Sequence, residues 1–276
     1  MLEWIAELLS YPFMVRALVV GVLVSLCSAL LGVSLVLKRY SMIGDGLSHV
    51  GFGSLAVAMA FGLAPLQVTI PVVVLAAFLL LRLSESGRIK GDAAVALIST
   101  SALALGVLTI SITTGMNTDV CNYMFGSILA MSTSDVRLSI LLSAAVLILF
   151  AFFYHRLFAV TFDESFSRAT GIHAGVYNML LATLTAVTVV LGMRMMGAML
   201  ISSLIIFPAL TAMRVCKRFL PVVLVSATLS VVCFVIGLGL SYALSTATGA
   251  SIVAVNLFAF LLFSLIGAVG KRRKPA

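Results

Sequence analysis

Apolar runs of about twenty residues recur along the chain and are separated by short polar or basic segments. A helix of about twenty apolar residues is roughly 30 Å long, which matches the hydrocarbon core of a bilayer. The pattern predicts nine membrane-spanning helices, or eight if the boundaries around residues 115–140 are misplaced. The predicted spans are 15–37, 42–62, 66–82, 93–113, 138–154, 175–193, 196–213, 221–243 and 251–270.

The pattern predicts helices throughout and no strands, because isolated strands leave backbone groups unpaired in lipid and the alternating pattern of a membrane barrel is absent. The segment "TTGMNTDVCNYMFGSILAMSTSD", which follows the span 93–113, contains a short apolar piece that we expect to form a partial or re-entrant helix. No internal repeat or low-complexity tract divides the chain. We therefore expect residues 1–276 to form one all-α, integral-membrane domain.

Composition supports a membrane protein, since 62% of the residues are hydrophobic and only 9% are charged, against about 25% charged in a soluble domain. The start of the chain, "MLEWIAELLSYPF", is expected to be an amphipathic segment at the membrane surface rather than a cleaved signal peptide. The net charge of +8 comes from basic clusters between spans, which is typical of cytoplasmic loops and not of a nucleic-acid-binding surface. These clusters place the N-terminus outside and the C-terminus in the cytoplasm.

The segment "RYSMIGDGLSHVGFGS", residues 39–54, contains Asp45 and His49 between apolar flanks. On a helix this spacing places both side chains on one face. One interpretation is that Asp45 caps the helix from the membrane surface while His49 bonds a carbonyl. An ionisable residue within a span is nevertheless a functional candidate by default, and here it is paired with an imidazole. We therefore favour a functional role for the pair.

A carboxylate and an imidazole together suit Zn²⁺, Mn²⁺ or Fe²⁺, and the chain lacks the thiolate set that would favour Cu⁺. Two ligands do not complete a site, so a symmetric dimer that duplicates them is one hypothesis. Small residues beside the pair are expected to allow close helix packing or to line a passage; they are Gly44, Gly46, Gly51 and Gly53. Pro208 is expected to kink its helix, with Ser202 and Ser203 bonding the freed carbonyls.

The longest polar stretch, residues 155–178, contains Phe158, Phe162 and Phe166 at four-residue spacing. This spacing predicts one face of a short helix, and a docking surface for a cytoplasmic partner is the sharper interpretation. The chain contains no GxxxxGK[ST] phosphate loop and no nucleophile or HExxH constellation. We therefore expect no catalytic residues and no enzymatic activity in this subunit.

Five segments in order resemble the permease subunits of metal-ion ABC importers, which take up zinc, manganese or iron in bacteria. These segments are "GVSLVLKRYSMIGDGLSHVGFGS", "NYMFGSILAMSTSDV", "VTFDESFSRATGI", "MGAMLISSLIIFPALTA" and "TATGASIV". Any one of them is a weak signal, but five in the right order are specific. Ser and Thr in "SFSRATGI" replace alanines that are commoner in the family.

The resemblance implies a homodimeric permease with a type II, vitamin-importer-like fold in the bacterial plasma (inner) membrane. Two cytoplasmic ATP-binding subunits would use ATP, and an extracytoplasmic metal-binding protein would deliver Zn²⁺ or Mn²⁺, and less readily Fe²⁺; no permanently bound cofactor is implied. The metal-path role is carried onto Asp45 and His49. The resemblance also assigns residues 161–172 to the ATPase-coupling segment, with its matching positions at Phe162, Asp163, Glu164, Arg168 and Gly171.

Three other functions remain as alternatives. A self-contained, proton-coupled secondary metal transporter would use Asp45 and His49 as a proton relay, but it would not need the amphipathic loop. An intramembrane enzyme would need a third ligand or a nucleophile. A permease for iron chelates or vitamin B12 would share the fold, but a bulky substrate has no evident use for this pair of side chains.

Overall fold

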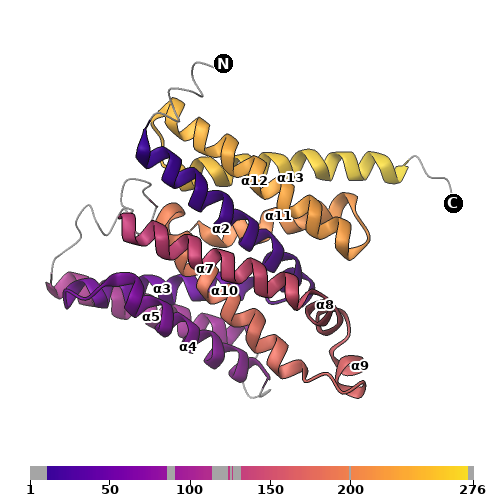
Figure 1. Ribbon diagram of the computed structural model, residues 1–276, viewed down its shortest axis with the longest axis horizontal. Helices are drawn as coiled ribbons and strands as arrows, with labels where there is room; N and C mark the ends of the chain where they lie inside the picture. Colours follow the sequence, from indigo (N-terminus) through magenta and orange to yellow (C-terminus); the bar gives the residue numbers. More distant parts are fainter. Residues whose placement is uncertain are drawn as a thin grey trace.

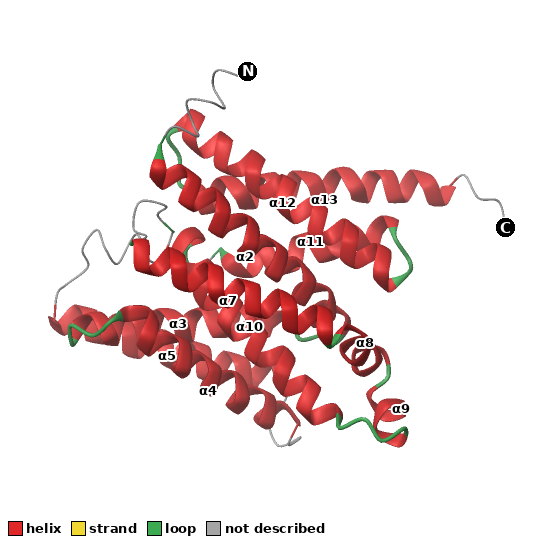
Figure 2. Ribbon diagram, in the orientation of Figure 1, coloured by secondary structure: helices red, strands yellow, loops and turns green. Residues whose placement is uncertain are grey.

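The computed structural model describes residues 11–85, 91–113, 124, 126, 132–198 and 200–272. Within these residues the secondary structure is entirely helical, as Figure 2 shows, and the fold class is the predicted one. The helices are α2 (Pro12–Leu37), α3 (Ser41–Ala60), α4 (Pro65–Glu85), α5 (Gly91–Thr113), α7 (Thr133–Phe152), α8 (Tyr154–Phe162), α9 (Glu164–Ala169), α10 (Ala174–Met196), α11 (Ile201–Val215), α12 (Phe219–Leu244) and α13 (Thr248–Arg272).

Each of the nine predicted spans corresponds to one of these helices. Seven helices in the described part of the chain are long and apolar enough to cross a membrane. The other two are α11, whose 15 residues give a length of only about 22 Å, and α3, whose Asp45, His49 and glycines lower its hydropathy. Nine crossings therefore stay a prediction. The expected surface segment up to residue 10 and most of the expected re-entrant segment lie outside the described residues.

The helices form two groups with three helices between them (Figure 1). One group contains α3, α4 and α5, and the other contains α11, α12 and α13, while α2, α7 and α10 lie between the groups. Among the seven long apolar helices, α2 and α10 are the most enclosed, each 67% buried over its most apolar stretch. The core is continuous through these two helices, so the two groups share one hydrophobic interior.

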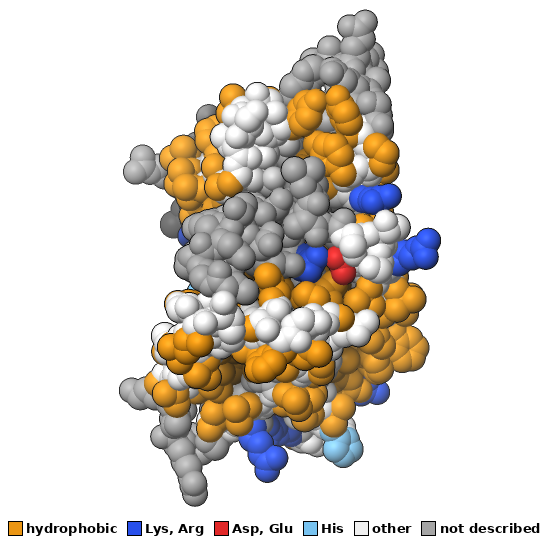
Figure 3. Space-filling view, turned by 90° about the vertical axis from the view of Figure 1, so that its left-hand side faces the viewer, with side chains coloured by type: hydrophobic (Ala, Val, Ile, Leu, Met, Phe, Trp, Pro, Cys, Tyr) orange, Lys and Arg blue, Asp and Glu red, His pale blue; other side chains and the backbone are white. Residues whose placement is uncertain are grey.

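The outer helices present large apolar side chains outward, as a helix exposed to lipid does. On α5 and α13 these side chains include Leu97, Leu105, Leu108, Ile112, Phe258, Leu261 and Leu265. Figure 3 shows the end of the molecule that is on the left in Figure 1, where hydrophobic side chains surround a few charged ones.

The opposite end of the bundle, on the right in Figure 1, carries α8, α9, the connection between α11 and α12, and the C-terminus. Three of the basic clusters between spans lie at residues 38–39, 156–168 and 214–218, and they belong to these segments or to the end of α2 beside them. This grouping is the one that the alternation of inward and outward spans requires.

Candidate metal site and coupling segment

Helix α3 carries Asp45 and His49 one turn apart on the same face. His49 Nε2 lies 3.7 Å from Asp45 Oδ2, and the two side chains are 21% and 36% exposed, respectively. This separation is too long for a hydrogen bond. A single ion about 2.1 Å from each ligand atom can bridge atoms up to about 4.2 Å apart. The two side chains are thus placed to bind one metal ion together.

A third polar group at this site comes from α11. The Ser202 hydroxyl donates a hydrogen bond to Asp45 Oδ1 at 3.1 Å, so it contacts the carboxylate rather than a carbonyl freed by Pro208 as we expected. The Ser48 hydroxyl donates to the Asp45 backbone carbonyl at 2.7 Å. The proximity of Ser202 to Asp45 has no signal in the sequence, since 157 positions separate the two residues.

Three of the glycines flanking the pair form close helix contacts. A Cβ atom on Gly53 would lie 2.3 Å from the Ala102 carbonyl oxygen of α5, and one on Gly46 would lie 2.6 Å from Val95 Cγ1. A Cβ atom on Gly44 would meet only the end of the Ile205 side chain, at 3.3 Å. Gly46 and Gly53 therefore let α3 pack against α5 at a distance that a larger residue would prevent.

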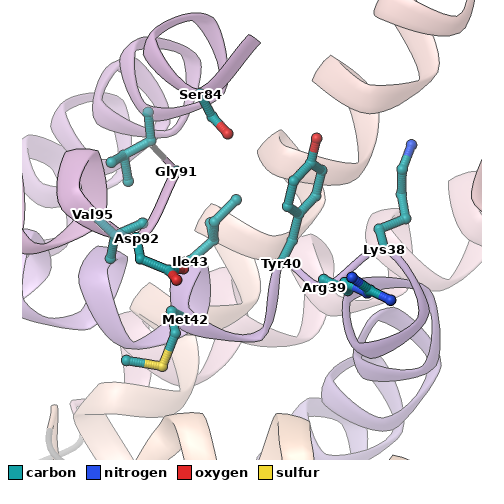
Figure 4. A pocket seen from close by; sticks show the side chains of 10 residues that line it. Lys38, Arg39, Tyr40, Met42, Ile43, Ser84, Gly91, Asp92 and Val95 are labelled. Atoms are coloured by element: carbon teal, nitrogen blue, oxygen red, sulfur yellow. The ribbon is translucent and has the colours of Figure 1, made fainter. Parts of the chain in front are cut away.

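A cavity of about 220 Å³ opens at the start of α3, between the turn after α2, the end of α4 and the start of α5 (Figure 4). Its lining includes Tyr40, Met42, Ile43, Ser84 and Asp92. In Figure 4 the Asp92 carboxylate lies beside Ile43 and Met42, whereas the Lys38 and Arg39 side chains point away from it. The cavity lies about one helical turn from Asp45.

Two charged side chains near helix ends form an ion pair that is largely buried. Arg194, near the end of α10, donates to Asp135 Oδ2 at 2.6 Å, and their side chains are only 7% and 19% exposed. Asp135 also forms a reciprocal capping box with Ser132 at the start of α7. The sequence gives no indication of this pairing, since 59 positions separate the two residues.

The predicted coupling segment forms two short helices instead of one. The chain is extended at Asp163 (φ −145°), and the Asp163 side chain caps α9 by accepting a hydrogen bond from the Phe166 backbone N–H at 2.8 Å. The expected single aromatic face is therefore wrong. Phe158 and Phe162 of α8 pack against Phe219 at the start of α12, with ring centroids 5.0 and 5.8 Å away.

The short helix α9 has two large exposed side chains, those of Phe166 and Arg168. Phe166 is 65% exposed, and the Arg168 side chain is 61% exposed. The helix ends in a Schellman motif, in which Gly171 adopts φ +84° and the Ile172 N–H donates to the Ser167 carbonyl at 2.9 Å. The Schellman motif therefore ends α9 at a defined residue.

Glu164, the first residue of α9, is held by several donors. Burial favours the neutral carboxyl and would raise its pKa, but hydrogen bonds from Asn178, Arg168 and Lys38 outweigh this effect. The pKa of Glu164 is consequently below its usual value, and the side chain is an anion at neutral pH.

Among the described residues there is no group of three or more His, Cys, Asp and Glu side chains that could hold a metal ion. The Asp45 and His49 side chains, with a serine hydroxyl next to them, are thus two candidate ligands per chain. The sites that bind metal ions most tightly have more ligands than this. Such a sparse, partly exposed pair suits an ion that is bound briefly and then released.

A polytopic bundle with a polar helix packed inside it and an amphipathic segment at one end is the architecture of a membrane permease. A model of the ABC 3 transport family matches residues 10–267, and the chain belongs to this family. The resemblance to permeases of metal-ion ABC importers is thereby confirmed.

Relatives and solved structures support the same assignment. The chain is 30% identical to the "Manganese transport system membrane protein MntC" of Halalkalibacterium halodurans, covering 93% of this chain and 89% of that protein. It is also 30% identical to the "Probable iron transport system membrane protein" of Haemophilus influenzae, covering 95% and 93%.

Among solved structures, "PsaBC from Streptococcus pneumoniae in complex with Fab" matches with a TM-score of 0.85 and 30% identity, over 95% of this chain and 94% of that chain. A second structure, described as a metal-chelate type ABC transporter in an inward-facing conformation, matches with a TM-score of 0.70 and 16% identity, over 92% and 86% of the two chains. At that identity the likeness concerns the fold alone.

Proposed function

We propose that this chain is the membrane-spanning subunit of an ATP-driven importer for a divalent transition metal, and that Asp45 and His49 bind the metal on its way through. The observation that carries the proposal is the 3.7 Å separation of the Asp45 and His49 ligand atoms on a glycine-rich helix enclosed by its neighbours. Family membership supports the importer class.

Manganese is the favoured ion. One carboxylate and one imidazole, with a serine hydroxyl beside them and no thiolate, form a donor set that suits Mn²⁺ better than a thiolate-preferring metal. Relatives named for manganese transport agree with this choice. Zinc uses the same ligand types and is the second candidate, followed by iron, for which one relative is named.

The proposed assembly is a homodimer of this chain in the bacterial inner membrane, with nine crossings, a type II fold and a cytoplasmic C-terminus. The exposed face of α9, with Phe166 and Arg168, would dock on a cytoplasmic ATP-binding subunit, since it offers an aromatic and a cationic side chain at the basic end of the bundle. An extracytoplasmic binding protein would deliver the metal at the other end.

A self-contained proton-coupled carrier is not favoured. Such a carrier would have no use for α9, whose exposed aromatic and cationic side chains lie outside the bundle. It would also need a proton relay, and no cluster of acidic and histidine side chains larger than the Asp45 and His49 pair occurs in the part of the chain that the structure describes.

The decisive experiment is metal uptake into proteoliposomes that contain the permease and its co-purified ATPase. Mn²⁺, Zn²⁺ and Fe²⁺ are compared with and without ATP, for the wild type and for the Asp45→Asn and His49→Ala variants. We expect ATP-dependent uptake that is greatest for Mn²⁺ and at least tenfold lower in both variants.

The matched control is His155→Ala, because His155 is an exposed histidine far from the site in sequence and should be neutral. Uptake that is driven by a proton gradient without ATP would contradict the importer proposal. Wild-type uptake in both site variants would contradict the role of the pair.

A further inference from the structure

The side chain of Lys38, which is only 7% exposed, lies at the junction of four helices. Lys38 is the C-terminal cap of α2. Its ammonium group donates to the Val160 carbonyl of α8 at 3.2 Å, to Glu164 Oε2 of α9 at 3.1 Å, and to Asn178 Oδ1 of α10. A lysine ammonium has three protons to donate, and each of these three acceptors comes from a different helix.

The acceptors are themselves joined to one another. Asn178, which is 3% exposed, donates from Nδ2 to Glu164 Oε2 at 3.1 Å. Arg168 donates to the other oxygen of Glu164, Oε1, at 2.6 Å. The carboxylate thus receives charge-assisted hydrogen bonds from two cations and an amide, which fixes the start of α9 relative to α2 and α10.

The turn that follows Lys38 leads directly into the helix with the proposed metal ligands. Arg39 adopts a left-handed conformation (φ +60°), and the Tyr40 N–H donates to the Leu35 carbonyl at 2.8 Å, which closes a Schellman motif. Helix α3 begins at Ser41, and Asp45 lies about 6 Å further along its axis. A displacement of Lys38 must therefore move the start of α3, because no flexible linker separates them.

We propose that Lys38 is a positioning residue that transmits movement of α9 to Asp45 and His49, by joining Glu164 to the tight turn at the start of α3. The inference rests on the proposed importer function. Lys38 itself contacts neither the metal nor the ATPase in this mechanism. Its task is to make α9 and α3 move together, so that ATP hydrolysis by the partner is used for transport.

The test compares wild-type permease with Lys38→Met and Lys38→Arg in complex with the co-purified ATPase in proteoliposomes. Three quantities are measured: ATP hydrolysis, Mn²⁺ imported per ATP hydrolysed, and Mn²⁺ binding to the permease. We expect Lys38→Met to hydrolyse ATP within twofold of wild type and to bind Mn²⁺ within threefold, while the imported Mn²⁺ per ATP falls at least tenfold. Lys38→Arg, which keeps the cation, should retain much of the coupling.

Arg39→Met is the matched control, since it removes the neighbouring exposed cation and should leave the Mn²⁺ to ATP ratio unchanged. The double variant Lys38→Met/Glu164→Gln should be no worse than Lys38→Met, because both changes remove the same link. A wild-type ratio in Lys38→Met would overturn the proposal. A parallel loss of hydrolysis, binding and thermal stability in both Lys38 variants would also overturn it, because it would assign Lys38 to folding. Absence of ATP-driven uptake in the wild type would instead reject the importer function.

Discussion

The close crossing of α3 and α5 gives a quantitative prediction for Gly53→Ala. The added Cβ atom would lie 2.3 Å from the Ala102 carbonyl oxygen, whereas ordinary contact begins at 3.4 Å, so the helices must separate by about 1 Å. The obstacle is backbone and cannot rotate away. The same crossing is tight from the other side, because a Cβ atom on Gly106 would lie 2.7 Å from Gly53 Cα.

Overpacking of this kind costs about 1–3 kcal/mol, against which replacing a helical glycine by alanine returns up to about 1 kcal/mol. We expect Gly53→Ala to be destabilised overall, with a melting temperature several degrees below that of the wild type in detergent. The melting temperature is measured from the amount of monodisperse protein that remains on size-exclusion chromatography after heating. Gly53→Leu should be destabilised further.

The matched control is Gly239→Ala in α12, where a Cβ atom would meet nothing within 4 Å. This variant should melt at or slightly above the wild-type temperature, since only the helix propensity changes. If Gly53→Ala melted no lower than Gly239→Ala, the close crossing would not be rigid, and the packing role of the glycines would be refuted.

Three further predictions concern the ends of the bundle. Arg194→Met should lose about 3–5 kcal/mol of stability by leaving the Asp135 carboxylate without its cation, and a second change, Asp135→Asn, should restore part of the melting temperature. Gly171→Ala, at φ +84° with open space around it, should weaken the end of α9 by about 1 kcal/mol, seen as roughly fivefold faster amide hydrogen exchange there, while Gly175→Ala should change nothing. The pKa of Glu164 is lowered on folding, so the stability that its carboxylate contributes is complete above the usual pKa of about 4.5. This stability is lost as the pH falls through the lower, folded-state pKa. The difference in melting temperature between wild type and Glu164→Gln should therefore stay constant from pH 8 to 5 and shrink only below pH 5.

The sequence by itself determined the class of the fold. Apolar runs of membrane length leave the helix as the only way to satisfy the backbone in lipid, so the helices occur where the runs predicted them. The positions of Asp45 and His49 on one face also followed from spacing, because the helical repeat is fixed. Both features depend on residues that are close together in the sequence, so the local sequence pattern predicts them.

Only the tertiary structure decided which distant groups meet. The contact of Ser202 with Asp45, the ion pair of Arg194 with Asp135, and the joining of Lys38 to Glu164 depend on how helices far apart in sequence pack together. The break at Asp163 is also tertiary in origin, since Phe158 and Phe162 bury part of their surface against Phe219 while α9 turns away. Periodicity describes one helix at a time, whereas packing and charge pairing are settled between helices.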